Sequence, residues 1–88
     1  MITDDEAVKM RKLEKVYRTH ADNIYKICLY YLRDEKKASD LAVKVFFNYY
    51  VEYGGENSKD TFGRLVHETK KLLLAEYGKK VEVEEQRE

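Results

Sequence analysis

The lack of proline is the feature that most restricts the fold of this chain. Its 88 residues contain no proline and four glycines, so there are few places at which the backbone could turn sharply. Folds made of many short strands need turn residues at regular intervals, whereas a few long helices do not. We therefore predict an all-α protein, a small antiparallel bundle of three to four helices.

The apolar residues support this prediction, because they recur at steps of three and four. This spacing is typical of a helix with one buried face. It runs through three stretches, which are residues 10–32, 38–53 and 62–77. The predicted folded domain spans residues 1–80, and residues 81–88, with four glutamates against one arginine, are predicted to form an acidic flexible tail.

Capping residues and glycines predict where the helices begin and end. Thr3 and Glu6 match a capping box, so the first helix is expected to begin near Asp4. Asp34 is expected to cap the second helix, and the glycine pair that begins at Gly54 is expected to end it.

Two further boundaries are predicted from polar residues. His20, Asp22 and Asn23 fall within the first apolar stretch, and since Asp and Asn readily cap helices, we predict a break or bend near His20. Asn57 or Ser58 is expected to cap the third helix, which Gly78 is expected to end.

Composition excludes several classes of protein. The chain is 43% hydrophobic and 39% charged, and no apolar run approaches the roughly 18 residues of a membrane span, so we expect a cytoplasmic protein with no membrane partner. The single cysteine, Cys28, cannot form an internal disulfide or build a tetrahedral metal site alone. No known catalytic or metal-binding motif is present, so we expect neither cofactor, nor metal, nor enzymatic activity.

Charge is unevenly distributed along the chain. Residues 1–35 hold seven acids and seven bases, whereas residues 58–80 hold six bases against three acids. The last helix is therefore predicted to be the only basic one. Basic residues beside aromatic rings are typical of sites for single-stranded nucleic acid. Four rings are expected in the core: Tyr17, Tyr31, Phe46 and Tyr49. Five are left as candidates for binding: Tyr30, Phe47, Tyr50, Tyr53 and Tyr77.

The order of residues resembles a known family. The first stretch carries Leu13, Val16, Tyr17, His20, Ile24 and Tyr25; the second carries Lys37, Ala38, Ser39, Asp40, Leu41, Ala42, Val43, Lys44, Val45 and Phe46; the third carries Phe62, Glu76, Tyr77, Lys79 and Lys80. In this order they resemble the promoter-melting domain, region 2, of bacterial RNA polymerase sigma factors, most closely the extracytoplasmic-function group. The resemblance implies a sigma region 2-like helical fold.

The resemblance also implies a transcription module without enzymatic activity. Its partners would be the clamp helices of the RNA polymerase core and the opened strand of promoter DNA. The residues implied in docking on the polymerase are Asp40, Leu41, Lys44 and Phe47. The residues implied in contact with nucleic acid are Arg64, His67, Lys70, Lys71, Tyr77, Lys79 and Lys80.

Several positions differ from the family pattern and leave alternatives open. Ser39 and Val43 replace a Glu and a Gln of the docking helix, and Leu65 and Leu72 replace a Trp and an Asn of the strand-binding helix. These changes motivate an alternative function, a helical protein–protein interaction domain derived from a sigma factor that no longer binds promoter DNA. The family's second, helix-turn-helix domain would have to come from a companion protein. Exposed aromatic residues could instead form a homodimer interface.

Overall fold

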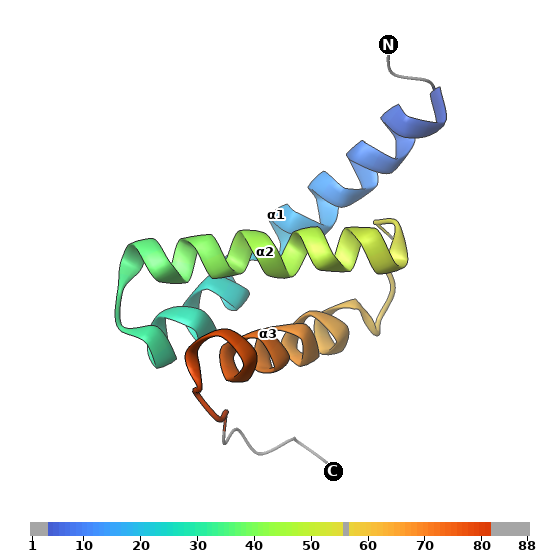
Figure 1. The fold of residues 1–88 in the computed structure, drawn as a ribbon. Helices are drawn as coiled ribbons and strands as arrows, with labels where there is room; N and C mark the ends of the chain where they lie inside the picture. Colours follow the sequence, from blue (N-terminus) through green and yellow to red (C-terminus); the bar gives the residue numbers. More distant parts are fainter. Residues whose placement is uncertain (1–3, 56, 82–88) are drawn as a thin grey trace.

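Three helices pack against one another in the structure, a computed structural model that describes residues 4–55 and 57–81. They are α1 (Asp4–Leu32), α2 (Glu35–Tyr53) and α3 (Thr61–Tyr77), and each contacts the other two (Figure 1). No strand occurs among the described residues. The prediction of an all-α protein is confirmed.

Helix α1 is continuous, so the predicted break near His20 is wrong. Its 29 residues correspond to about 43 Å of helix. Val16 and Ile24, on either side of His20, are both fully buried in the same core, so the apolar face continues past His20. Asp22 is exposed, and the His20 ring packs against that of Phe62 with the ring centroids 5.5 Å apart.

The N-terminal half of α1 extends beyond the part of the bundle that α2 and α3 form (Figure 1). Val8 and Met10, both in this half, are exposed. The part of α1 beyond Val16 carries the fully buried residues Ile24 and Cys28. The bundle is therefore anchored by α1 from Val16 onward, and the turns before Val16 project beyond α2 and α3.

The predicted ends of α2 and the predicted end of α3 are confirmed. Asp34 caps α2, because its side chain accepts a hydrogen bond from the backbone N–H of Lys37 at 2.9 Å. Gly54 ends α2 with a left-handed φ of 66°, and its N–H donates to the carbonyl of Tyr50 at 2.7 Å. Gly78 ends α3 with a φ of 65°. Glycine adopts this conformation without the steric cost that other residues meet.

The start of α3 differs from the prediction. Its N-cap is Asp60, whose side chain makes no capping hydrogen bond, rather than Asn57 or Ser58. Ser58 instead forms a tight turn, in which its Oγ accepts from the Asp60 N–H at 3.2 Å and its own N–H donates to Thr61 Oγ1 at 2.8 Å. Thr61 Oγ1 also bonds the buried Tyr49 hydroxyl at 2.9 Å. This turn therefore fixes the start of α3 against α2.

The core is built from apolar side chains of all three helices. Its members are Val16, Ile24, Cys28, Ala38, Leu41, Ala42, Val45, Phe46, Tyr49, Leu65, Leu72 and Leu73. Phe46 and Tyr49 are buried as predicted, and the hydroxyl of Tyr49 is buried as well. Tyr31 is half-buried. The prediction for Tyr17 is wrong, because its side chain remains 44% exposed, although its ring packs against that of Phe46 with the centroids 4.9 Å apart.

Val81 packs against the core, and it lies one residue beyond the predicted end of the domain at residue 80. Thr3 of the predicted capping box, and the predicted tail after Val81, lie outside the described residues. Within those residues, no helix has both the length and the apolar character that a membrane crossing requires.

Candidate interaction surfaces

Of the four residues implied in polymerase docking, only three lie at the surface. Leu41 is 2% exposed and belongs to the core, so the prediction that it contacts a partner is wrong. It lies four residues before Val45, which is fully buried, and residues at this spacing share one helix face. Asp40 and Phe47 are on the outer side of α2, where Phe47 is 62% exposed.

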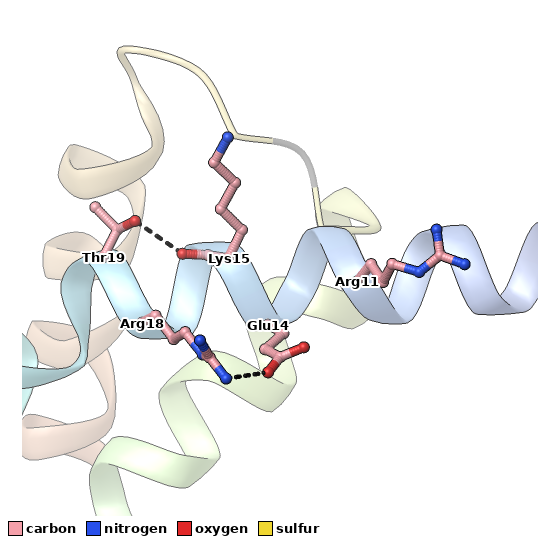
Figure 2. Close-up of a pocket in the computed structure, with 5 residues that line it drawn as sticks. All are labelled: Arg11, Glu14, Lys15, Arg18 and Thr19. Atoms are coloured by element: carbon pink, nitrogen blue, oxygen red, sulfur yellow. Dashed lines mark hydrogen bonds and ion pairs between the residues drawn. The ribbon is translucent and has the colours of Figure 1, made fainter.

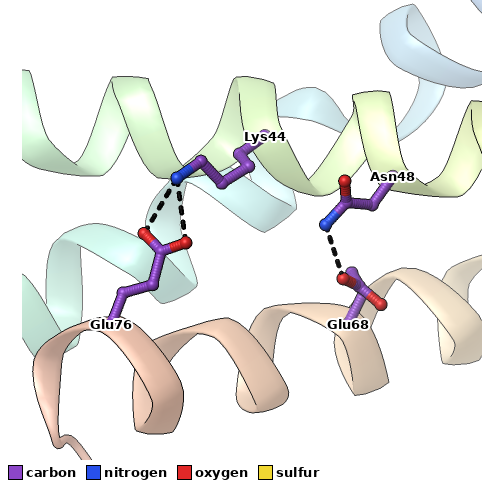
Figure 3. A network of polar contacts seen from close by, with 4 residues as sticks. All are labelled: Lys44, Asn48, Glu68 and Glu76. Atoms are coloured by element: carbon purple, nitrogen blue, oxygen red, sulfur yellow. Dashed lines mark hydrogen bonds and ion pairs between the residues drawn. The ribbon is translucent and has the colours of Figure 1, made fainter.

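Lys44, the fourth residue of this set, is already paired within the molecule. Its ammonium group donates to both carboxylate oxygens of Glu76 on α3, at 2.8 and 3.0 Å (Figure 3). The hydrogen bond and the charge of Glu76 raise the pKa of Lys44 above its ordinary value. Lys44 therefore connects α2 to α3.

Exposed apolar side chains gather where α1 and α2 meet. Val43, Phe47 and Val51 follow one another at steps of four along α2 and are all exposed, so they form a row on one side of the helix. Next to this row is a groove of about 380 Å³, lined by Met10, Leu13, Glu14, Tyr17, Val43, Phe46 and Phe47. We call Met10, Leu13, Tyr17, Val43, Phe46, Phe47 and Val51 the α1–α2 apolar surface.

On α3, the structure brings together three of the residues implied in nucleic-acid contact. Arg64, His67 and Lys71 line one hollow of about 480 Å³. The guanidinium of Arg64 lies 4.4 Å from the centroid of the Tyr53 ring, a cation–π contact. The ammonium group of Lys71 lies 3.2 Å from a carboxylate oxygen of Glu68.

The same hollow also contains acidic side chains. Glu52, Asp60 and Glu68 line it. Glu68 is nearly buried, and its second carboxylate oxygen accepts from Asn48 Nδ2 at 2.8 Å (Figure 3). With three acids beside two permanent bases, this hollow does not present a positive surface.

The other residues implied in nucleic-acid contact are not part of this hollow. Lys70 lies about a third of a helical turn around α3 from Arg64. Tyr77 is partly buried and packs against the core. Lys79 and Lys80 follow Gly78, beyond the end of α3, and are exposed. The structure therefore spreads the seven predicted residues over separate parts of α3 and its C-terminal extension.

A second basic region lies on α1, so the prediction that only the last helix is basic is wrong. Residues 11–18 contain four bases, Arg11, Lys12, Lys15 and Arg18, and one acid, Glu14. Figure 2 shows three of these bases along the helix. The count over residues 1–35 missed them, because acids elsewhere in that window balance the bases. A count over windows of eight to ten residues would have found this region.

Among the described residues, no set of three His, Cys, Asp or Glu side chains is placed to hold a metal ion. Cys28 is buried, and burial raises the pKa of its thiol from 9.0 to about 11, which opposes formation of the nucleophilic thiolate.

Comparison of the chain with protein-family models, with curated proteins and with solved structures finds no match.

Proposed function

We propose that this chain is a non-enzymatic, sigma region 2-like transcription module. Its α1–α2 apolar surface binds the clamp helices of bacterial RNA polymerase, and its basic residues contact the opened promoter strand. The observation that carries the proposal is the α1–α2 apolar surface. Large exposed apolar patches on small proteins mark sites of protein association.

The composition of this surface fits a helical partner. The groove between α1 and α2 is bounded by Phe47 on one side and by Met10 and Tyr17 on the other. A groove of this kind accepts the apolar face of an amphipathic helix. A ring as exposed as that of Phe47 would contribute on the order of 2 kcal/mol if a partner buried it fully.

Charged side chains border the apolar surface and supply its polar edge. Asp40 lies one turn before Lys44 on α2 and pairs with Lys36 at 3.3 Å. Glu14 lies at the groove on α1 and pairs with Arg18 at 2.7 Å. Since both pairs are largely exposed, they are worth little to the folded state. Their charges can orient a charged partner on the surface and raise the rate at which it associates.

A binding experiment with purified RNA polymerase core tests the proposal. We expect the chain to bind, and Phe47→Asp to weaken binding at least tenfold, because the charge would be buried in an apolar contact. Tyr30→Asp is the matched control, since Tyr30 is 68% exposed and lies outside the α1–α2 apolar surface. Absence of binding, or equal loss in both variants, would refute docking through this surface.

The alternative is an interaction domain that binds another protein. It is favoured by Val43, which is exposed in the middle of the docking face where the family has a polar residue. Tagged wild-type and Phe47→Asp proteins, incubated with host lysate, would distinguish the two functions. Recovery of polymerase subunits by the wild type alone supports the transcription module. Recovery of a different protein, with the same dependence on Phe47, supports the alternative.

A homodimer is the remaining candidate for this surface. Light scattering over a range of concentrations tests it, and a dimer that Phe47→Asp dissociates would show that a second copy occupies the surface. If a companion protein supplies the family's second domain, it should appear among the polypeptides recovered from the lysate.

A further inference from the structure

The basic side chains of α1 form a row that faces away from the core. Arg11, Lys15 and Arg18 follow one another at steps of four and three, so they lie on one side of the helix. All three are exposed. At 1.5 Å per residue they extend over about 10 Å of the helix. This length equals about three phosphates along one strand of a duplex, where each takes up about 3.4 Å of the helix axis.

Two hollows lie beside this row and share Lys15. Arg11, Lys15 and Arg18 line one of about 510 Å³, together with Glu14 and Thr19 (Figure 2). Lys15 also lines a second hollow of about 470 Å³, whose other lining residues are Lys12, Tyr53, Gly54, Gly55 and Asn57. The described residues of the second hollow include no acid. Lys15 therefore links the row on α1 to the loop that follows α2.

The charges of this row and of the neighbouring Lys12 are mostly available to a ligand. Among the described residues, Arg11, Lys12 and Lys15 make no ion pair, and the Arg18–Glu14 pair is solvent-exposed. The basic side chains of α3 are less available. Lys71 pairs with the nearly buried Glu68, and Arg64 packs on Tyr53. Positive charge on this molecule is therefore more accessible on α1 than on α3.

The arrangement favours a nucleic acid over a membrane surface. A helix that lies in a membrane interface buries a free apolar face beneath its basic face. In α1 the apolar face is packed against the bundle from Val16 onward, by Val16, Ile24 and Cys28. Before Val16, Met10 and Leu13 line the groove that α1 shares with α2, so this part of the face belongs to the α1–α2 apolar surface. Arginine also suits phosphate, because its planar donors bind two oxygens at once.

We infer that Arg11, Lys12, Lys15 and Arg18 form a binding surface for the phosphate backbone of a nucleic-acid strand, and that this face of α1 provides more of the phosphate contact than α3. The inference rests on the strand contact of the proposed function. It does not depend on docking to the polymerase.

The test is a titration of a fluorescent single-stranded oligonucleotide with purified protein at several salt concentrations. Three to four phosphate contacts predict a slope of log affinity against log salt of about −2 to −3. Arg11→Gln with Lys15→Gln should weaken binding at least tenfold at low salt and reduce the slope by about 1.4. Circular dichroism should show unchanged helicity, because both side chains are exposed.

Two matched double variants identify the site. Lys36→Gln with Lys37→Gln removes the same charge from the far end of the bundle and should leave the slope nearly unchanged. Lys70→Gln with Lys71→Gln tests α3 and should have a smaller effect than the α1 pair. An equal loss in the Lys36 and Lys37 variant, or a larger loss in the α3 variant, would overturn the inference.

The remaining outcomes separate this inference from other ligands and from polymerase docking. Vesicles with anionic lipid, used as a second probe, should bind more weakly than the oligonucleotide. Vesicle binding without oligonucleotide binding would overturn the inference in favour of a membrane. Phe47→Asp should retain oligonucleotide binding, and the α1 double variant should retain polymerase binding. Loss of oligonucleotide binding and loss of polymerase binding are therefore measured separately, and the failure of one proposal can be told from the failure of the other.

Discussion

The thiol of Cys28 should be nearly inert while the protein is folded. The side chain is 0% exposed, and burial raises its pKa to about 11 from 9.0. At pH 8, a thiol with the ordinary pKa is about one-tenth thiolate, whereas at a pKa of about 11 about one-thousandth is ionised. Since the thiolate is the reacting form, alkylation of the folded protein should be at least about 100-fold slower than alkylation of the unfolded chain.

Mass spectrometry after timed exposure to iodoacetamide measures both rates at pH 8, in buffer and in denaturant. Cys28 is the only cysteine, so each alkylated molecule reports this site alone. A native rate within tenfold of the denatured rate would refute the placement of Cys28 in a packed core shared by Ile24 and Leu73.

The same thiol makes a pH-dependent contribution to stability. Because the pKa is higher in the folded than in the unfolded state, the neutral thiol is favoured by folding, and the contribution is fully present below pH 9. It is lost as the pH rises towards 11, by up to about 3 kcal/mol. Urea denaturation of wild type and Cys28→Ala between pH 8 and pH 11 should show this loss in the wild type alone. Parallel curves for the two proteins would contradict it.

Two pairs of neighbouring or matched substitutions test the packing and the turns by urea denaturation. Leu73→Ala should lower the free energy of unfolding by about 2–5 kcal/mol because Leu73 is fully buried. Leu74→Ala, at a 57% exposed position, should change it by less than about 0.5 kcal/mol. Equal effects would mean that α3 does not turn Leu73 towards the core and Leu74 towards solvent. Gly54→Ala should destabilise by about 1–2 kcal/mol because its φ is 66°, whereas Gly63→Ala, within α3 and with open space around it, should stabilise by up to about 1 kcal/mol. Effects of the same sign at both glycines would contradict the assignment of Gly54 as the helix end.

The parts of the fold that depend on local chemistry could be predicted from the sequence. Asp34 caps α2 and Gly54 ends it because a carboxylate or a glycine acts on backbone groups only a few residues away. The continuity of α1 could not be predicted in this way. It depends on Val16 and Ile24 packing into one core, which is a property of the assembled bundle and outweighs the capping tendency of Asp22.

The candidate surfaces were predicted less well, for two physical reasons. Leu41 was implied in docking by the resemblance, although its place in the apolar pattern of α2 already agreed with the burial that the structure shows. The basic row that contains Lys15 was hidden by a charge count over a window longer than the row. The burial of Leu41 and the alignment of the basic residues around Lys15 both depend on which face of a helix a residue occupies. Neither a motif nor a charge total contains that information.

The N-terminal turns of α1, which project beyond α2 and α3, should unfold locally before the rest of the helix. Backbone amides of residues 7–13 are held by helical hydrogen bonds with little core beneath them, so they should exchange with deuterium through fraying, well before those of residues 16–32. Any partner that occupies the groove at Met10 and Phe47 would have to hold these turns of α1 in place. Slower exchange in this segment would then report occupancy of the groove directly, even for a partner whose identity is unknown.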